Sequence, residues 1–340
     1  RQNNQGISLG ADNFRNIANF NSSFKLGKKF TTDIMVNYIN QRTKNRPYSV
    51  DRMINNFTGM MGRFDNADWY LDRYMTSKGY KFVTGTNQSL TPDENIIYPG
   101  FKGDIADYVW RVKEHKEDEW SNRVITSMTN NWQILNNLRL RTRASIDFTA
   151  LKTESRQRTE IPLAFGNSGY FGMRNTISSI AYGDVLLTYT QKINDDLELN
   201  VMGGYTASKQ EETITGRSTN GGLSTENMFD VTASVGLANS ESFRFKLVRD
   251  AFIGTVNASY KDYLFLEGTI RRDRTSTMHP SQNAFVYPSV NSSFIVSEAF
   301  NLPSFITYAK LRASWGIVGS YPEMYMANIA YTQNTLGVQE

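Results

Sequence analysis

Side chains suited to catalysis or metal binding are few in this sequence of 340 residues. It contains no cysteine, which excludes thiolate metal sites and thiol nucleophiles. Its two histidines, His115 in "KEHKED" and His279 in "TMHP", have no second histidine at metal-ligand spacing. The carboxylates at 117–119 could bind calcium, but they are better interpreted as a solvated loop. We therefore expect a chain that is not an enzyme and that carries no metal or cofactor.

Motifs for phosphate or acyl chemistry are also missing. "GNSGY" at 166–170 is not the Gly-x-Ser-x-Gly elbow of a hydrolase, and the Gly-Gly pairs at 203–204 and 221–222 lack phosphate-binding spacing. The formal net charge of +4 is small, and the basic residues are spread along the chain. This distribution argues against nucleic-acid binding.

The most informative pattern is the segment "LRLRTRASIDFTA" at 138–150, in which two kinds of residue alternate. A period of two is the pleat of a β-strand, whose successive side chains leave opposite faces. One face is mainly apolar and carries Leu138, Leu140, Thr142, Ala144, Ile146, Phe148 and Ala150. The other is polar and carries Arg139, Arg141, Arg143, Ser145, Asp147 and Thr149.

The same design recurs along the chain as about ten strands in five hairpins. Short turns are expected near residues 27–28, 136–137, 194–196 and 261–262, with a last connection through "AFNLPS". Long excursions separate the hairpins, at 42 to about 122, 152 to about 180 and 210 to about 248. No stretch of eighteen apolar residues is present, so a helical membrane span is excluded. Short turns at one end and long loops at the other are typical of a transmembrane antiparallel up-and-down β-barrel in an outer membrane.

Three segments carry a family resemblance. "NASYKDYLFLEGTIRRDRTS", "FVYPSVNSSFIVSEAF" and "YAKLRASWGIVG" follow one another between residues 251 and 318. In their order and spacing they resemble the barrel region of the SusC/RagA family of TonB-dependent outer-membrane transporters.

The resemblance implies a barrel of 22 strands around an N-terminal plug in a Gram-negative outer membrane. It also implies import of bulky nutrients, oligosaccharides or peptides, powered through TonB, ExbB and ExbD, with a SusD-like surface lipoprotein as a lid. About ten strands are too few for such a barrel, and "YTQNTLGVQE" does not resemble its last strand. We therefore expect residues 1–340 to be part of one barrel domain, with the plug and the remaining strands outside this sequence.

Two groups of residues are candidates for substrate contact. On the polar face, Arg143 and Asp147 are expected to line a wet lumen. Arg139 and Arg141 lie nearer the short turn and are interpreted as rim residues that contact the plug or lipid headgroups. In the first long excursion, Trp69, Tyr70, Tyr74 and Trp110 could stack on sugar rings, pack against a lid protein, or form a small core of the loop itself.

Short helices are expected in that excursion. The first would carry Met53, Ile54, Phe57, Met60 and Met61, with Ser49 or Asp51 as its cap, and the second Trp69, Leu71, Tyr74 and Met75. Two other functions stay open: a passive or structural outer-membrane barrel that acts as an envelope scaffold, and a soluble β-sandwich or adhesin. Strand length disfavours the soluble alternative.

Overall fold

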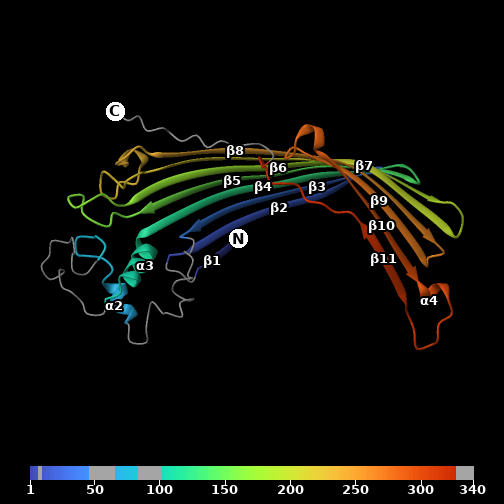
Figure 1. Ribbon diagram of the computed structural model, residues 1–340, viewed down its shortest axis with the longest axis horizontal. Coiled ribbons are helices and arrows are strands. Elements are labelled where there is room, and N and C mark those ends of the chain that lie inside the picture. The colour runs from blue at the N-terminus through green and yellow to red at the C-terminus, as the bar shows by residue number, and fades with distance from the viewer. Residues whose placement is uncertain (7–9, 46–65, 83–100, 327–340) are drawn as a thin grey trace.

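A computed structural model describes residues 1–6, 10–45, 66–82 and 101–326 of the chain. Within these ranges, eleven strands form one antiparallel sheet in the order of the sequence (Figure 1). The predicted antiparallel up-and-down sheet is thereby confirmed, and in the described residues it is open, with β1 and β11 at its edges. The strands are β1 Gln2–Gln5, β2 Asp12–Leu26, β3 Phe30–Lys44, β4 His115–Leu135, β5 Leu138–Gln157, β6 Tyr170–Lys192, β7 Leu197–Ser218, β8 Asn239–Tyr260, β9 Leu264–Thr275, β10 Ala284–Ile295 and β11 Lys310–Gly316.

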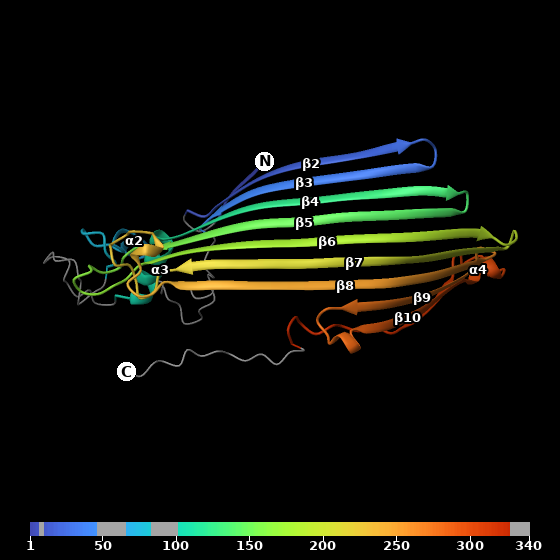
Figure 2. The ribbon, with the colours of Figure 1, turned by 90° about the horizontal axis from the view of Figure 1, so that it is seen from above.

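The two ends of the sheet differ, as the sequence predicted. Residues 27–29, 136–137, 193–196 and 261–263 make the tight connections at one end, and the connections 45–114, 158–169 and 219–238 lie at the other (Figure 2). The connection 296–309 before β11 is an exception, since it is longer and lies at the end with the tight turns. Lys261 and Asp262 have φ values of 48° and 57°, the left-handed conformation of the central residues of a tight hairpin turn whose twist matches the flanking strands. Gly27 has the same left-handed conformation, at φ 67°, which glycine adopts without strain because it has no side chain.

The strands are longer than the sequence predicted. β4 to β8 contain 20 to 23 residues each, whereas a tilted strand needs roughly 9–11 to cross a bilayer. The predicted excursions at 42–122, 152–180 and 210–248 were therefore too long, since the connections run from 45 to 114, 158 to 169 and 219 to 238. Where a strand extends out of the bilayer, water contacts both of its faces. The apolar alternation therefore ends there, while the backbone hydrogen bonds to the neighbouring strands continue.

One face of the sheet carries most of its exposed apolar side chains. Directly paired residues point to the same side, so Leu140, its partner Leu187 and the next partner Gly203 share this face. Phe148 is 39% exposed and Val256 is 45% exposed on the same side. The sheet is arched in Figure 1, and because side chains on the inside of an arch converge, the more enclosed face is assigned to the inside. We call the exposed apolar face the convex face and its opposite, which holds most of the enclosed strand residues, the concave face.

The apolar part of the convex face forms a band of bilayer height. In β5 it runs from Leu138 to Ala150, and in β7 from Leu197 to Ala207. It ends where the first convex-face cations appear, for example Lys152 and Lys209. These bands of 13 and 11 residues are long enough for a tilted strand to cross the hydrocarbon core, which takes roughly 9–11.

In its described residues, the first long connection contains two helices, α2 (Ala67–Asp72) and α3 (Gly103–Glu114). Asn66 caps α2, because its side-chain oxygen accepts a hydrogen bond from the Asp68 amide at 3.0 Å. The second predicted helix corresponds in part to α2, which contains Trp69 and Leu71 but ends before Tyr74 and Met75, whereas α3 was not anticipated. The first predicted helix and residues 331–340 lie outside the described residues. A third short helix, α4 (Val296–Ala299), lies in the connection before β11, and none of the helices in the described ranges is long and apolar enough to span a membrane.

Candidate functional site on the concave face and in the loops

The concave face carries a cluster of paired charges at mid-strand. The carboxylate of Asp184 in β6 is fully enclosed, with 0% of its side chain exposed. Arg143, directly opposite in β5, donates from Nε to Asp184 Oδ2 at 2.8 Å. The Arg143 guanidinium also donates to the Tyr182 hydroxyl at 3.2 Å and lies 4.9 Å from that ring's centroid. Arg143, the leading lumen candidate, is therefore positioned by two partners from the neighbouring strand.

Arg139 and Arg141, the two arginines assigned to the rim, have different environments in the structure. Arg141 reaches the same carboxylate, with its terminal nitrogen 3.5 Å from Asp184 Oδ1. Arg139 lies two residues nearer the tight connection, opposite Gln133 and Thr188, and it is exposed. The charge cluster therefore contains two cations and one anion, and its excess positive charge faces the concave side.

Asp147, the second lumen candidate, belongs to a separate pair. Its carboxylate accepts a hydrogen bond from Arg123 Nε at 2.8 Å, diagonally across the β4–β5 ladder. Arg123 is 45% exposed and Asp147 is 28% exposed. This pair is solvated, so its net contribution to stability is small, and both groups remain accessible from the concave side.

The four aromatic candidates of the first loop are neighbours. Tyr70 and Trp110 are 5% and 0% exposed, and Tyr70 belongs to a small core with Ile105, Ala106 and Val109 of α3. Trp69 and Tyr74 pack against this core and are half-buried. The Trp69 ring lies 5.0 Å from the Tyr70 ring in a T-shaped arrangement. Because a substrate ring needs an accessible face, Trp69 and Tyr74 are better placed for stacking than Tyr70 and Trp110.

Contacts between loops join this small core to the connections after β5 and β7. Thr159 and Asn227 exchange two hydrogen bonds of 3.0 Å, one through each side chain. The Tyr80 hydroxyl donates to Glu226 at 2.8 Å, and Lys81 forms ion pairs with Asp107 and Glu160. We call the described residues of these three connections the loop cluster (66–82, 101–114, 158–169 and 219–238).

Shifted pKa values in the loop cluster and at its junction with β4 include those of His115 and Tyr74. Burial, reinforced by the Arg111 guanidinium, lowers the pKa of His115 from 6.5 to about 4. Burial also raises the pKa of Tyr74, and the hydrogen bond from its hydroxyl to Glu114 at 3.0 Å acts in the same direction. Both groups are therefore neutral at pH 7.

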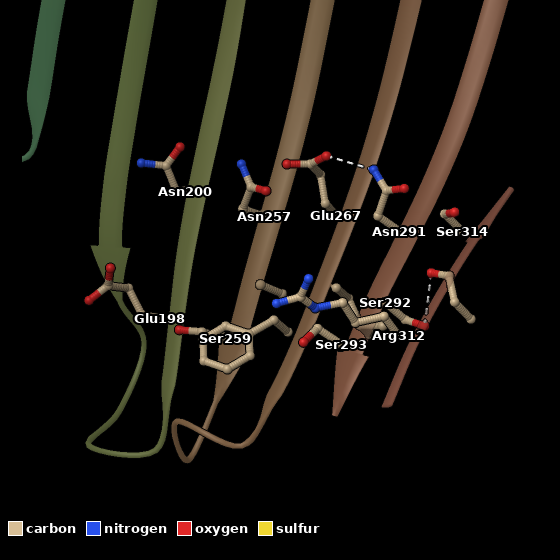
Figure 3. Close-up of a pocket in the computed structure, with 14 residues that line it drawn as sticks. Glu198, Asn200, Asn257, Ser259, Glu267, Asn291, Ser292, Ser293, Arg312 and Ser314 are labelled. Carbon is tan, nitrogen blue, oxygen red and sulfur yellow. Dashed lines mark hydrogen bonds between the residues drawn. The ribbon is translucent and has the colours of Figure 1, made fainter. Parts of the chain in front are cut away.

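A polar row crosses five strands near the tight turns of β7, β8 and β9 (Figure 3). Asn200, Asn257, Glu267, Asn291 and Ser314 are successive partners in the ladder, one from each of β7 to β11. They line a hollow of about 530 Å³ on the concave face. Within the row, the Asn291 side-chain amide donates to Glu267 at 2.8 Å.

Sequence reasoning missed this row, Asp184 and Tyr182. The side chains of the row come from strands whose alternation was recognised, but their alignment depends on the register between hairpins. Long loops leave that register undetermined. The one sequence signal for Asp184 was a charged residue next to the alternating, mainly apolar stretch of the same strand.

Comparison with known proteins supports the fold. No family model and no curated protein matches the sequence. A chain of the RagAB peptide transporter is similar over 90% of this chain and 33% of its own length, with 14% identity and a TM-score of 0.65. Chains of the RagAB peptide importer in its "open-open" and "closed-closed" states give TM-scores of 0.66 and 0.65 at the same identity and coverage of this chain.

The chain spans about a third of the length of these structures. At this identity the likeness concerns the fold, and it agrees with the sequential antiparallel sheet, the turn asymmetry and the apolar band. The described residues therefore share the fold of part of the RagAB transporter chains.

Proposed function

We propose that the chain is a sector of an outer-membrane transporter that imports bulky polar nutrients, oligosaccharides or peptides. TonB, ExbB and ExbD would supply the energy through a plug encoded elsewhere in the full-length protein. A SusD-like lipoprotein would close the extracellular mouth. The observation that carries the proposal is the opposition of an apolar convex band and a charged, hydrogen-bonding concave face in one sheet.

The concave face suits a polar solute with many weak contacts. Several of its charges are paired within the wall, as in Arg143 with Asp184 and Arg123 with Asp147. Such pairs present hydrogen-bonding atoms without a strong field of one sign. A neutral or zwitterionic solute could therefore exchange contacts along the wall without binding too tightly to leave. The similar RagAB structures are those of a peptide transporter, which favours peptides among the two substrate classes.

The loop cluster is proposed as the surface that meets the lid. It lies at the end of the sheet that is extracellular in barrels of this fold (Figure 2). Trp69 and Tyr74 keep part of their rings accessible there, so they could contact either the lid protein or the first residues of a substrate.

Uptake by cells with and without TonB tests the proposal. The full-length gene should restore uptake of a peptide or oligosaccharide mixture to a deletion strain, and loss of TonB should abolish that uptake. Uptake that persists without TonB would favour the passive barrel. Normal growth with no transport defect, together with a misassembled envelope, would favour the scaffold.

A further inference from the structure

Basic residues collect on the convex face immediately above the apolar band. The register places eleven Lys and Arg side chains there and only five Asp and Glu side chains. We call this set the convex basic belt. The cations are Arg42, Lys44, Lys116, Lys152, Arg156, Lys209, Arg217, Arg244, Lys246, Arg272 and Arg274, and the anions are Asp12, Asp118, Glu154, Glu211 and Asp250.

The positive excess is specific to this face. On the concave face, the same strands carry acidic residues above mid-strand, among them Glu117, Glu119, Glu212 and Glu241. The whole chain has a net charge of only +4. A generally basic protein would show cations on both faces, so the convex basic belt marks a surface that meets negative charge.

At one place in the convex basic belt, the cations lie at the end of a groove in the apolar band. Lys209 in β7 pairs with Ala181 in β6 and Val248 in β8, and it lines a hollow of about 570 Å³ in the apolar band. The groove exists because several residues at its floor are small. Its convex-face lining is Thr126, Met128, Ala144, Ile146, Ala181, Gly183, Ala207, Lys209 and Val248.

The cations at the head of this groove outnumber their partners. Glu211 lies 2.8 Å from Lys209 and 3.8 Å from Lys246, so two ammonium groups share one carboxylate. Arg244 lies one convex-face position further along β8 and is exposed. Lys209 and Lys246 keep 43% and 58% of their side chains accessible. The group is therefore a net-positive site open to the bilayer surface.

We propose that this site binds a phosphate-bearing lipid of the outer leaflet, with its phosphate at Lys209, Arg244 and Lys246 and an acyl chain in the groove below. Charge complementarity identifies the occupant, because a lipid phosphate lies directly above its own acyl chains. The site presents the same vertical order, cations above and an apolar hollow beneath. The inference rests on the membrane placement in the proposed function, but not on transport.

Binding of defined lipids to the purified full-length protein tests the site. The probes are bis-phosphorylated lipid A and the same lipid without its phosphates, and bound lipid is counted by native mass spectrometry in detergent. The variant K209Q/K246Q should bind bis-phosphorylated lipid A roughly 10- to 30-fold more weakly, since each cation near a lipid phosphate contributes on the order of 1 kcal/mol. Removal of the phosphates should weaken binding to the parent protein by a similar factor.

Two further variants separate the site from general effects. K28Q/K29Q removes the same charge in the tight turn at the opposite end of the strands and should bind lipid A as the parent does. Ala181→Phe fills the groove from an exposed position and should weaken binding without removing a cation.

Equal binding by K209Q/K246Q and K28Q/K29Q would overturn the proposal, as would equal affinity for the dephosphorylated lipid. Retained uptake in K209Q/K246Q together with lost lipid binding would leave the transport proposal standing. Lost uptake in the TonB-deficient strain is a separate result, so the two proposals fail independently.

Discussion

Arg143 and Asp184 face each other across the β5–β6 ladder, and the Asp184 carboxylate is enclosed at a 2.8 Å distance from the Arg143 Nε atom. Arg141 reaches the same carboxylate from the next concave-face position. An enclosed carboxylate requires such partners, because an isolated charge away from water is strongly unfavourable. Asp184 therefore organises the two arginines that line this part of the wall.

Replacing Asp184 by alanine should destabilise the folded barrel by about 2–3 kcal/mol. This is somewhat less than the 3–5 kcal/mol of a fully buried pair, because Arg143 is 41% exposed and can recover water contacts. Asp147→Ala is the matched control, and since its partner Arg123 is 45% exposed, it should change stability by less than about 1 kcal/mol. Urea unfolding of the full-length protein in lipid vesicles measures both values. Equal effects would contradict the structural role assigned to Asp184.

The transmembrane part of the fold could be predicted because hydrocarbon imposes a strict pattern. Between Leu138 and Ala150, every second side chain must suit lipid, so the strand and its turn are visible in the sequence. Beyond Ala150 that demand ends, and the continuation of β5 to Gln157 leaves no comparable signal. Helix α3 was missed for a different reason, since its apolar residues pack on α2, which is more than thirty residues away in the chain.

The candidate site could be predicted only within single hairpins. Alternation placed Arg143 and Asp147 on the same wet face, and the structure agrees with that placement. It could not pair Arg143 with Asp184, because the connection of residues 158–169 leaves the β5–β6 register undetermined. Contact of these residues with a substrate stays a prediction.

Asn227→Ala should open the contact between the connections after β5 and β7. The substitution removes Asn227 Oδ1, which accepts a hydrogen bond from the Thr159 amide at 3.0 Å. Thr159 is fully enclosed, so water cannot replace the lost acceptor. It also places alanine at φ 55°, which asparagine tolerates better. We expect a local loss of about 1–3 kcal/mol, seen as faster amide hydrogen exchange in residues 158–169 and 219–238. Asn227→Gly accommodates the backbone and should show a smaller effect; an unchanged exchange rate in both variants would exclude the contact as a clamp.

Trp110→Ala should unfold the small core of the first loop while leaving the sheet intact. Its side chain is 0% exposed beside Tyr74, so truncation leaves a cavity that costs about 3–5 kcal/mol. Limited proteolysis should then cut within α2 or α3, whereas the strands stay resistant. Trp132→Ala, at a convex-face position that is 46% exposed, is the control and should leave the loop resistant. Unchanged resistance of α2 and α3 in Trp110→Ala would contradict the expected packing role of Trp110 beside Tyr74.

Acidification should loosen the junction of α3 and β4 through His115. The folded pKa of about 4 lies below the unfolded value of 6.5, so folding favours the neutral imidazole. The stability it contributes is complete above pH 6.5 and is lost progressively as the pH falls from 6.5 to 4. Amide exchange of residues 103–118, corrected for its intrinsic pH dependence, should therefore quicken between pH 7.5 and 5.0. His115→Gln should lack this pH dependence, because glutamine does not titrate. An imidazole that titrates by NMR near 6.5 in the folded protein would contradict both the burial argument and the expected loosening.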